Sequence, residues 1–364
     1  MKRLNTATVT WISYRNFGTF LQAYALQQSL IKIGCCNRIL SDKKIVDTFF
    51  PNNWKSIISN FVNRATSLFN AFEKGQRRSN RAYDDFARRF LKIDYDWKNF
   101  EELNHKYDIF ICGSDQIWSP IVPFDAYFYL DFTTKKKIAY APSIGSSVYP
   151  QEKVSQIKPY LLKFSHLSIR EEQGKEILEK QFGLTCQTVL DPTLLLDKEE
   201  WEKFITVEKD QNYILCYFLT FNEVYWKFVQ QFANEKGLLL KALIIHPQDL
   251  NYVDEPLYVG PKGFLNAIKN SRYFFTDSFH GSVFAVHFEK QFVAFKRFKE
   301  TSEQNQNSRI VNLFKKLGLT DLFVSESDLS KVNIDTKIDF SAVKEKLSLE
   351  QSKSLKYLQQ AILQ

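Results

Sequence analysis

The stretch RYFFTDSFHGSVFAVHF, residues 272–288, contains the pattern from which the fold of this chain follows. Residues 272–275 predict a buried strand, and the apolar residues 283–288 predict a helix after it. Between them lies a polar turn that ends in His280, one of only 5 histidines in the chain. A strand that runs through a polar turn into a helix is the repeating unit of α/β folds, and ligands bind at such turns. We therefore expect His280 to lie at a binding site.

The same unit recurs along most of the chain. Strand patterns before residue 200 lie at 8–13, 107–112, 137–141, 166–170 and 188–190, with helix patterns at 19–33 and 171–181. Beyond residue 200, strand patterns lie at 213–219, 238–245, 272–275 and 292–295, with helix patterns at 223–236 and 261–270. Strands that alternate with helices form parallel sheets. The chain is therefore expected to fold as two doubly wound α/β domains of the Rossmann type.

The two series of strands set the expected domain boundaries. The N-terminal Rossmann-like domain covers 1–200 and contains a helical insertion, rich in aromatic and charged residues, at about 45–105. The C-terminal Rossmann-like domain covers 201–330, and a helical tail covers 331–364. Residues 341–363 of this tail are amphipathic, so we expect them to pack back across the junction of the domains.

The composition is that of a globular protein, with 44% hydrophobic and 25% charged residues among 364. The formal net charge of +8 fits an anionic ligand, a phospholipid surface or nucleic acid. Zinc-knuckle spacing and an RNP-like aromatic strand are both missing, so we do not expect nucleic-acid binding. The 5 cysteines, an odd number without paired CxxC spacing, indicate reduced thiols. Without a signal-peptide pattern or an apolar run near the ~20 residues of a membrane span, we expect a cytoplasmic protein.

Unusual polar residues gather where the predicted strands end. These segments are 14–18, 113–116, Ser143, 170–171, 191–193 and 277–280. In open α/β sheets, ligands bind outside the carboxyl ends of the strands. Six such ends, contributed by two domains, are therefore expected to face one cleft.

Two turns of the N-terminal domain are candidate binding segments. Gly18 permits a backbone conformation that other residues resist and brings amide groups close to an anion, although a plain helix cap explains it equally well. Asp115 is placed to accept a proton from a hydroxyl, or alternatively to cap the next turn. Gln116 and Trp118 favour a sugar-binding surface, because an indole offers a flat face to a pyranose ring.

Arg170 and His280 are the candidate ligands for an anion. Arg170 ends a strand, where a guanidinium can clamp a carboxylate or phosphate with two hydrogen bonds; a surface ion pair with Glu171 is the alternative. His280 stands where the N-terminus of a helix attracts anions, and the alternative is a capping histidine bonded into the interior.

Taken in chain order, six motifs resemble those of the polysaccharide pyruvyl transferase family. They are NFG at 16–18 with QAYAL at 22–26, GSDQIW at 113–118, YAPSIG at 140–145, SIRE at 168–171, LDPTLL at 190–195 and TDSFHG at 276–281. The resemblance implies a GT-B-like fold with a cleft between the two domains. It also implies a transferase that moves the enolpyruvyl group of phosphoenolpyruvate to a sugar of a cell-surface polysaccharide or its precursor, as a pyruvate ketal.

The resemblance implies that an arginine like Arg170 and a histidine like His280 hold phosphoenolpyruvate. The C-terminal domain is then the donor side and the N-terminal domain the acceptor side. The expected donor-binding residues are Arg170, Ser278, Phe279, Gly281 and Ser282. The expected acceptor-binding residues are Asn16, Gly18, Ser114, Gln116 and Trp118. His280 is the expected proton donor and Asp115 the expected proton acceptor.

The chain departs from some relatives at one donor position. Those relatives carry Arg-Leu-His where this chain has Ser-Phe-His at 278–280, so one cation expected on the donor is missing. Lys296, Arg297 and Arg309 are the candidates to replace it. Phosphoenolpyruvate is expected as a co-substrate rather than as a bound cofactor, and the sequence contains no visible metal-ligand cluster.

Two other functions fit the same architecture. A nucleotide-sugar-dependent GT-B glycosyltransferase would carry an acidic residue for the ribose and a Gly-rich diphosphate loop, of which GPKG at 260–263 is the only hint. A non-catalytic glycan-binding relative would keep the fold without releasing phosphate. The expected acceptor is a glycan or a lipid-linked sugar. A lipid-linked acceptor would explain the basic, aromatic segment 50–100 and would suit peripheral contact with the inner face of the membrane, although a solvated basic helix explains it equally well.

Overall fold

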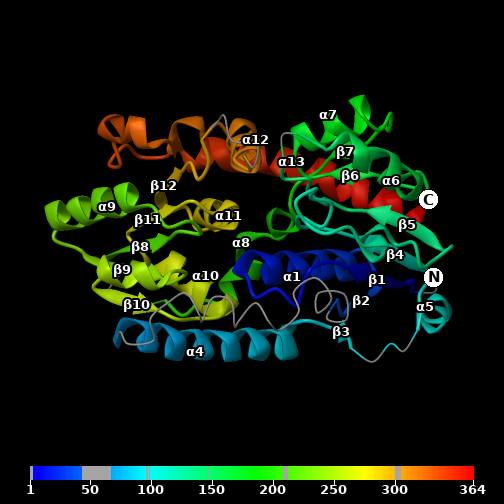
Figure 1. Ribbon diagram of the computed structural model, residues 1–364, viewed down its shortest axis with the longest axis horizontal. Helices are drawn as coiled ribbons and strands as arrows, with labels where there is room; N and C mark the ends of the chain where they lie inside the picture. The colour runs from blue at the N-terminus through cyan, green and yellow to red at the C-terminus, as the bar shows by residue number, and fades with distance from the viewer. Residues whose placement is uncertain are drawn as a thin grey trace.

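The computed structural model describes residues 3–42, 67–95, 97, 99–146, 148–207, 212–299 and 305–364. Two parallel β-sheets, each flanked by helices, lie side by side in it (Figure 1). The N-terminal sheet has the strand order β3-β2-β1-β4-β5, and the C-terminal sheet has the order β10-β9-β8-β11-β12-β13. This confirms the predicted GT-B-like arrangement of two doubly wound domains.

The strands of the N-terminal sheet are β1 (Asn5–Val9), β2 (Cys36–Leu40), β3 (Ile93–Asp94), β4 (Ile109–Cys112) and β5 (Lys136–Ala139). Beside it, β6 (Ser168–Ile169) and β7 (Gln187–Thr188) pair with each other, and a bridge from Ile138 to His166 joins them to β5. The strands of the C-terminal sheet are β8 (Tyr213–Tyr217), β9 (Leu239–Leu243), β10 (Glu255–Leu257), β11 (Tyr273–Thr276), β12 (Gln291–Phe295) and β13 (Phe323–Val324).

The helices connect these strands across the faces of the sheets. Before residue 200 they are α1 (Phe17–Lys32), α4 (Ser67–Phe90), α5 (Phe100–Lys106), α6 (Gln151–Leu161), α7 (Glu172–Lys180) and α8 (Lys198–Glu202). After it they are α9 (Glu223–Lys236), α10 (Pro261–Asn270), α11 (Phe279–His287), α12 (Ser308–Leu317) and α13 (Phe340–Leu363). None of the helices in the described ranges is long and apolar enough to span a membrane.

The order of strands reverses beside the first strand of each sheet. β1 lies between β2 and β4, and β8 lies between β9 and β11. The connections that leave the carboxyl ends of such neighbouring strands run to opposite faces of the sheet and leave a crevice between them. Each domain therefore offers a ligand-binding crevice at the carboxyl end of its sheet.

The first strand is shorter than its pattern predicts. Residues 10–13 are predicted as strand, but β1 ends at Val9. The backbone amides of Ile12 and Ser13 instead donate to the carboxylate of Asp42, over 3.0 and 3.3 Å. The chain thus leaves the sheet toward the crevice and carries Trp11 with it, a consequence of a long-range contact that a local pattern cannot reveal.

The predicted insertion at about 45–105 holds one long helix in its described part. The segment 43–66 lies outside the described residues. After α4, β3 joins the edge of the N-terminal sheet, so the segment is not helical throughout. α4 itself packs on the C-terminal domain, although it precedes residue 200. Ser79 donates to the carbonyl oxygen of Val259 over 2.6 Å, and a Cβ at Gly260 would lie 2.7 Å from the backbone of Ala82.

Aromatic side chains fill the seam between the two domains. The ring of Phe17, at the start of α1, stacks on Phe264 of α10 with 4.5 Å between ring centroids. The same ring meets Tyr83 of α4 and Tyr217 of β8, each at 5.4 Å. All four side chains are buried in one hydrophobic cluster that runs through both domains. Burial of aromatic rings stabilises the position of one domain against the other.

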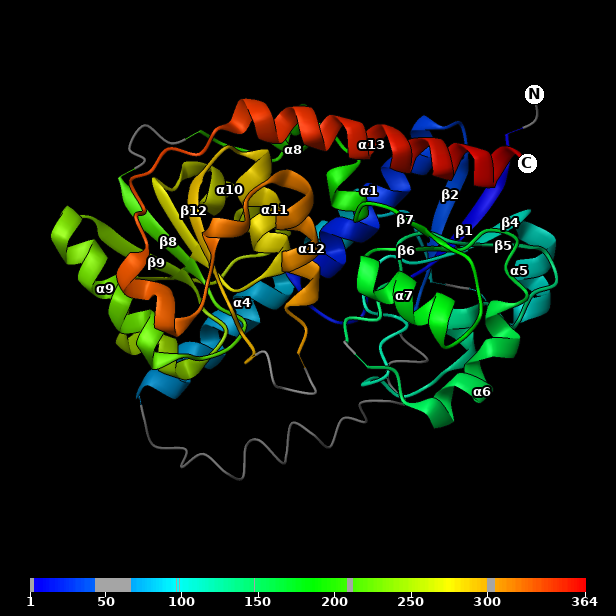
Figure 2. The ribbon, with the colours of Figure 1, turned by 90° about the horizontal axis from the view of Figure 1, so that it is seen from above.

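The C-terminal helix crosses back over both domains, as predicted (Figure 2). Near its end, the hydroxyl of Tyr357 donates to the carbonyl oxygen of Ala139 over 3.0 Å. The hydroxyl of Ser354 accepts from the amide of Leu190 over 2.9 Å. Leu358 is fully buried between these contacts. α13 thereby holds the segment that follows β7 in place.

Removing the buried leucine of α13 should weaken the fold. Leu358→Ala deletes a fully buried side chain, so we expect the free energy of unfolding to fall by about 2–5 kcal/mol. Leu349→Ala, in the same helix but 60% exposed, is the matched control and should change it by less than about 0.5 kcal/mol. Urea unfolding followed by circular dichroism measures both. Equal losses in the two variants would show that α13 does not clasp the domains.

Candidate active site

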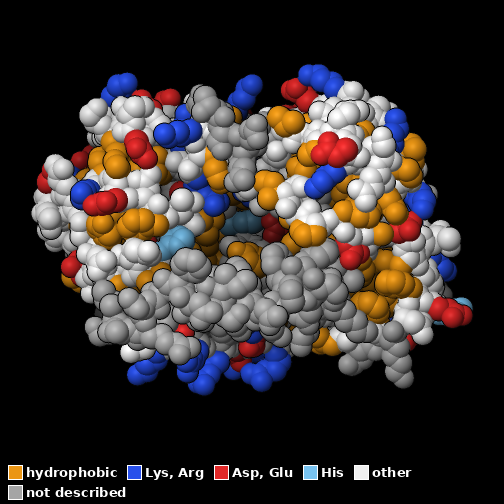
Figure 3. All heavy atoms as spheres, in the orientation of Figure 1, with side chains coloured by type: hydrophobic (Ala, Val, Ile, Leu, Met, Phe, Trp, Pro, Cys, Tyr) orange, Lys and Arg blue, Asp and Glu red, His pale blue; other side chains and the backbone are white. Residues whose placement is uncertain are grey.

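A cavity of about 940 Å³ lies between the two domains, at the crevices of both sheets. Figure 3 shows the molecule hollowed at this seam. Its N-terminal wall carries Trp11, Tyr14, Arg15, Asn16, Thr19, Asp115 and Gln116. Its C-terminal wall carries Asp277, Ser278, Phe279, His280, Arg297, Gln306 and Arg309, and Phe72 and Gln76 of α4 close one side. Segments from both predicted domains thus face one cavity.

Asp191 joins the two domains at the edge of this cavity. It follows β7 as the N-cap of a short turn, where its Oδ1 accepts from the amide of Thr193 over 2.9 Å. Its Oδ2 accepts from Nη1 of Arg170 over 2.6 Å and lies 3.6 Å from Nε2 of His280. Burial alone would raise the pKa of Asp191, but His280 and Arg170 outweigh it and hold that pKa well below its usual value. The carboxylate therefore stays ionised between Arg170 from the N-terminal half of the chain and His280 from the C-terminal half.

Arg170 is buried at the end of β6, as its place in the sequence predicts. Its guanidinium lies 4.8 Å from the centroid of the Phe279 ring, a cation–π contact with the other domain. Carboxylates of Asp115 and Glu171 each approach to 4.0 Å. Burial would lower the pKa of Arg170, but Asp191, Asp115 and Glu171 raise it. Its Nε and Nη2 have no hydrogen-bond acceptor among the described residues.

His280 lies in the first turn of α11 and against α1. The side chain of Ser278 caps α11 by accepting from the amide of Gly281 over 3.2 Å. A Cβ on Gly18 would lie 1.9 Å from Nδ1 of His280, so only glycine fits there. Gly18 is thus explained by close approach to the imidazole rather than by contact with a ligand.

Asp115 projects into the cavity from the end of β4. Its Oδ2 accepts from the hydroxyl of Thr19 over 2.8 Å, and its Oδ1 accepts from the amide of Gln116 over 2.9 Å. Gln116 in turn donates to the side chain of Gln306 across the seam, over 3.1 Å. Asp115 and His280 thus line the cavity from different domains, and both lie near the pair Arg170 and Asp191.

The model of the polysaccharide pyruvyl transferase family matches residues 16–297. The chain belongs to this family. The match covers every motif on which the resemblance in the sequence rests and confirms it. No curated protein matches the chain. 

Several solved structures are similar to this chain at low sequence identity, each with a TM-score below 0.5. An α-glucosyltransferase in complex with UDP and a 13-mer DNA is 9% identical, with a TM-score of 0.49 over 98% of this chain and 95% of that one. A UDP-GlcNAc 2-epimerase from Methanocaldococcus jannaschii is 11% identical, with a TM-score of 0.48 over 96% and 99% of the two chains. A UDP-GlcNAc 2-epimerase from Neisseria meningitidis is 10% identical, with a TM-score of 0.43 over 96% and 100%.

The structure brings most of the predicted site residues of this transferase together. Asn16, Asp115, Gln116, Ser278, Phe279 and His280 line the cavity. Arg170, Ser114 and Gly18 lie directly behind its surface. Ser114 is fully buried, and its hydroxyl lies 2.8 Å from the carbonyl oxygen of Ala141 and 3.3 Å from Oδ2 of Asp191. Its place supports the site from behind rather than facing an acceptor.

Three predicted site residues do not reach the cavity. Trp118 is buried, stacked on Tyr129 with 5.7 Å between centroids, and its indole N–H donates to the carbonyl oxygen of Phe128. Gly281 faces Thr276, where an added Cβ would lie 2.5 Å from the hydroxyl oxygen. The hydroxyl of Ser282 donates back to the carbonyl oxygen of Ser278. Local pattern could not show this, because the orientation of each side chain is set by its tertiary neighbours.

Other residues of the cavity carry no assigned role in the sequence prediction. Trp11 lines the cavity, and its buried Nε1 has no acceptor among the described residues. Asp277 accepts from the amides of Leu219 and Thr220 and lies 3.7 Å from Arg297, while burial raises its pKa to about 6. Asp191 stands in the LDPTLL motif, which was the only signal in the sequence for its role.

Within the described ranges, no group of three or more His, Cys, Asp and Glu side chains is arranged to hold a metal ion.

Loss of the shared carboxylate should destabilise the transferase. Asp191→Asn removes the carboxylate that is hydrogen-bonded to the buried guanidinium of Arg170, so we expect a loss of about 3–5 kcal/mol in the free energy of unfolding. Asp197→Asn, an exposed aspartate nearby, is the matched control and should cost little. Chemical unfolding of both variants tests this. If Asp191→Asn unfolds like the wild type, the carboxylate does not organise the seam.

His287, the last residue of α11, forms a pH-dependent hydrogen bond to the turn that follows Asp191. Its Nε2 donates to the carbonyl oxygen of Thr193 over 2.8 Å, and burial lowers its pKa to about 4. The unfolded chain binds a proton at His287 near pH 6.5, whereas the folded chain does so only near pH 4. Stability from this group is therefore present above pH 6.5 and is lost as the pH falls toward 4, by about 3 kcal/mol in total.

His287→Gln should flatten this pH dependence, since glutamine does not titrate but keeps an N–H donor. The free energy of unfolding, measured by urea titration at several pH values between 7 and 4, should fall by about 3 kcal/mol less than in the wild type. His105→Gln removes a histidine whose side chain is 82% exposed and should leave the profile unchanged. Identical profiles for wild type and His287→Gln would contradict the assignment.

Proposed function

We propose that this protein transfers the enolpyruvyl group of phosphoenolpyruvate to a sugar of a cell-surface polysaccharide or its precursor, forming a pyruvate ketal. Membership of the family carries the transferase part of this proposal. The observation that favours phosphoenolpyruvate is the pair Arg170 and His280. One comes from each half of the chain, and both meet at Asp191 beside a cavity that both halves line.

The cavity suits a small, highly charged donor. Phosphoenolpyruvate carries about three negative charges near neutral pH. Arg297, Arg309 and His280 line the cavity, and Arg170 lies behind Phe279. The N-terminus of α11, a helix of 9 residues, adds the partial positive charge of its free amide groups. Cations and amides together match the carboxylate and the phosphate of this donor.

His280 and Asp115 fit the two proton transfers that ketal formation requires. A proton must reach the methylene carbon, which becomes a methyl group, while one sugar hydroxyl adds to the neighbouring carbon and loses its own proton. A second hydroxyl then displaces the phosphate at the same carbon, and its proton leaves with the phosphate. We assign the first proton to His280, which has Asp191 beside it as a counter-charge for the imidazolium. Asp115, from the other domain, accepts the hydroxyl proton.

The remaining volume suits the acceptor. A cavity of about 940 Å³ exceeds the needs of phosphoenolpyruvate alone. Trp11, Tyr14 and Phe72 line the cavity, and aromatic faces of this kind bind sugar rings. Trp11 and Trp118 are both buried, but only Trp11 lines the cavity, so we propose Trp11 as the tryptophan on the acceptor side.

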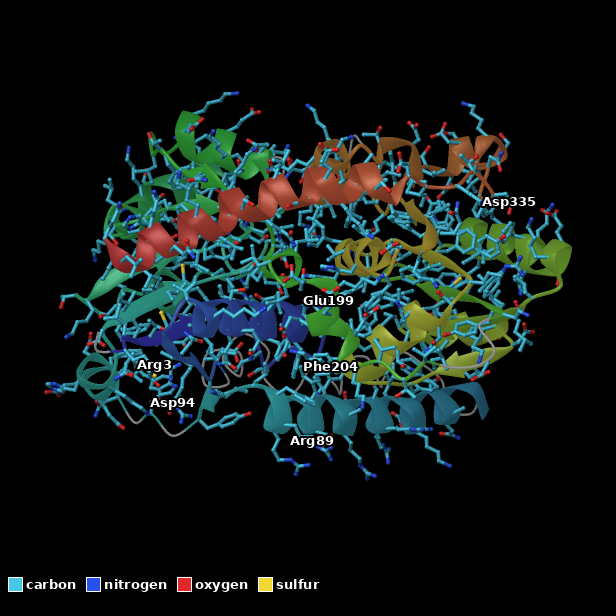
Figure 4. The ribbon with its side chains drawn as sticks, turned by 180° about the vertical axis from the view of Figure 1, so that it is seen from behind. Arg3, Arg89, Asp94, Glu199, Phe204 and Asp335 are labelled. Carbon is cyan, nitrogen blue, oxygen red and sulfur yellow. The ribbon has the colours of Figure 1, made fainter. Side chains whose placement is uncertain are left out.

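A lipid-linked acceptor and peripheral membrane contact remain part of this proposal. The outer face of α4 exposes a row of cations, and Figure 4 shows one of them, Arg89, directed away from the body of the molecule. Arg88 and Arg89 pair with Asp85, and Arg77 pairs with Glu73. Such paired charges are also those of an ordinary solvated helix, so the support from α4 is modest.

The proposal is tested by incubating the protein with phosphoenolpyruvate and a panel of glycosides and lipid-linked sugars. We expect acceptor-dependent release of phosphate and, by mass spectrometry, an acid-labile pyruvate adduct. His280→Gln should lower kcat by about 100-fold or more, and Asp115→Asn should also lower it. His105→Gln, at the surface, is the matched control.

UDP-, GDP- and CMP-sugars offered in the same assay provide the contrast. Turnover of one of these donors without turnover of phosphoenolpyruvate would replace the proposal with a glycosyltransferase. Binding of a glycan without release of phosphate from any donor would replace it with a binding protein. Near-normal kcat in a folded His280→Gln variant would remove His280 from the mechanism.

A further inference from the structure

We infer that Arg309, at the start of α12, binds the phosphate group of the donor and replaces the cation that position 278 lacks. This inference rests on the proposed function and names the residue that completes its donor site. It starts from Ser278, which cannot supply the charge. Ser278 is buried, and its hydroxyl is engaged as the N-cap of α11.

The structure separates the three candidate cations. Lys296 lines a different cavity, with Gln173 and Ser308, and its ammonium lies 5.8 Å from the centroid of the Phe323 ring. Arg297 lines the main cavity, but its Nε donates to the hydroxyl of Thr220 over 3.0 Å and lies 3.7 Å from Asp277. Lys296 and Arg297 therefore each interact with other side chains of the protein.

Arg309 lines the main cavity with unused hydrogen-bonding capacity. Its Nη2 donates to Gln306 over 3.1 Å, whereas its buried Nε has no acceptor among the described residues. Three more nitrogen atoms are buried without a hydrogen-bond partner among the described residues, namely Nε and Nη2 of Arg170 and Nε2 of His280. Arg309 and Arg170 also line one small pocket beneath Phe279. Nitrogen atoms without a hydrogen-bond partner, contributed by Arg309, Arg170 and His280 around Phe279, fit an anion with several oxygens, such as a phosphate.

The charge around Arg309 also favours an anion. Burial and the charges of Arg170 and Arg297 lower the pKa of Arg309 to about 9, and they outweigh Asp115 and Glu171. Arg309 is the second residue of α12, where a cation opposes the helix dipole and gains no helix stability. Its position is therefore better explained by a ligand than by the fold, and the N-terminus of α12 attracts the same anion.

Inorganic phosphate is the probe that tests the site without relying on turnover. Phosphate added at constant ionic strength should raise the melting temperature of the wild-type protein. Arg309→Gln should weaken the apparent affinity for phosphate by at least about 10-fold. Lys315→Gln removes one charge from an exposed position of the same helix and is the matched control. Arg309→Lys keeps the charge but not the planar donors, so we expect it to lie between the wild type and Arg309→Gln.

Kinetics with phosphoenolpyruvate supply the second readout. Arg309→Gln should raise the KM for phosphoenolpyruvate by about 10-fold or more, with a smaller rise for Arg309→Lys and none for Lys315→Gln. Phosphate binding that depends on Arg309, without turnover of phosphoenolpyruvate, would uphold the anion site and overturn the proposed donor. Turnover of phosphoenolpyruvate with an unchanged KM in Arg309→Gln would overturn this inference and leave the function intact. A wild-type protein whose melting temperature ignores phosphate would also overturn it.

Discussion

The whole arrangement depends on one buried carboxylate, Asp191, that Arg170 and His280 share. An ionised side chain away from water is costly unless charges and hydrogen bonds compensate it. Asp191 meets this demand with Arg170 from the end of β6 and His280 from α11, besides its own turn at Thr193. Since these partners belong to different domains, the carboxylate stays satisfied only while both domains keep their present positions. Two other contacts help to hold these positions. Gly18 lies close to His280, and α13 contacts Leu190, the residue before Asp191.

The seam between the two domains explains part of the high aromatic content of the chain. Aromatics make up 15% of the chain, more than a core alone requires, and the sequence leaves open whether they mark a membrane or an acceptor surface. The structure uses Phe17, Tyr83, Tyr217 and Phe264 as one buried cluster between the domains. Rings that pack partly face to face and partly edge to face resist sliding, because each displacement loses contacts on several sides. The seam beneath the cavity is therefore held by apolar packing around the ion pairs, and neither alone would hold it as firmly.

The predictability of each feature follows from the range of the interaction behind it. Alternating strand and helix patterns are local, so the two sheets and helices such as α9 and α10 are recognisable in the sequence. Arg170 and His280 can also be recognised in the sequence as site residues, because residues at the carboxyl ends of parallel strands converge whatever their separation along the chain. The edge strands β3 and β13 have only 2 residues each, too few to carry such a pattern. The packing of α4 on the far domain and the burial of Trp118 depend on neighbours distant in sequence, and no local rule contains them.

The two walls of the cavity carry different chemical groups, because each wall belongs to a different domain. The cations Arg297 and Arg309 and the start of α11 belong to the C-terminal domain, whereas Asp115, Thr19 and Trp11 belong to the N-terminal domain. A donor held by the first set and an acceptor held by the second would meet between His280 and Asp115. The proposed proton donor and proton acceptor would then come from different domains, and addition of a hydroxyl and protonation of the methylene carbon could proceed together between them. The carboxylate that fixes the domains beside one another therefore also fixes the distance across which the proposed reaction would take place.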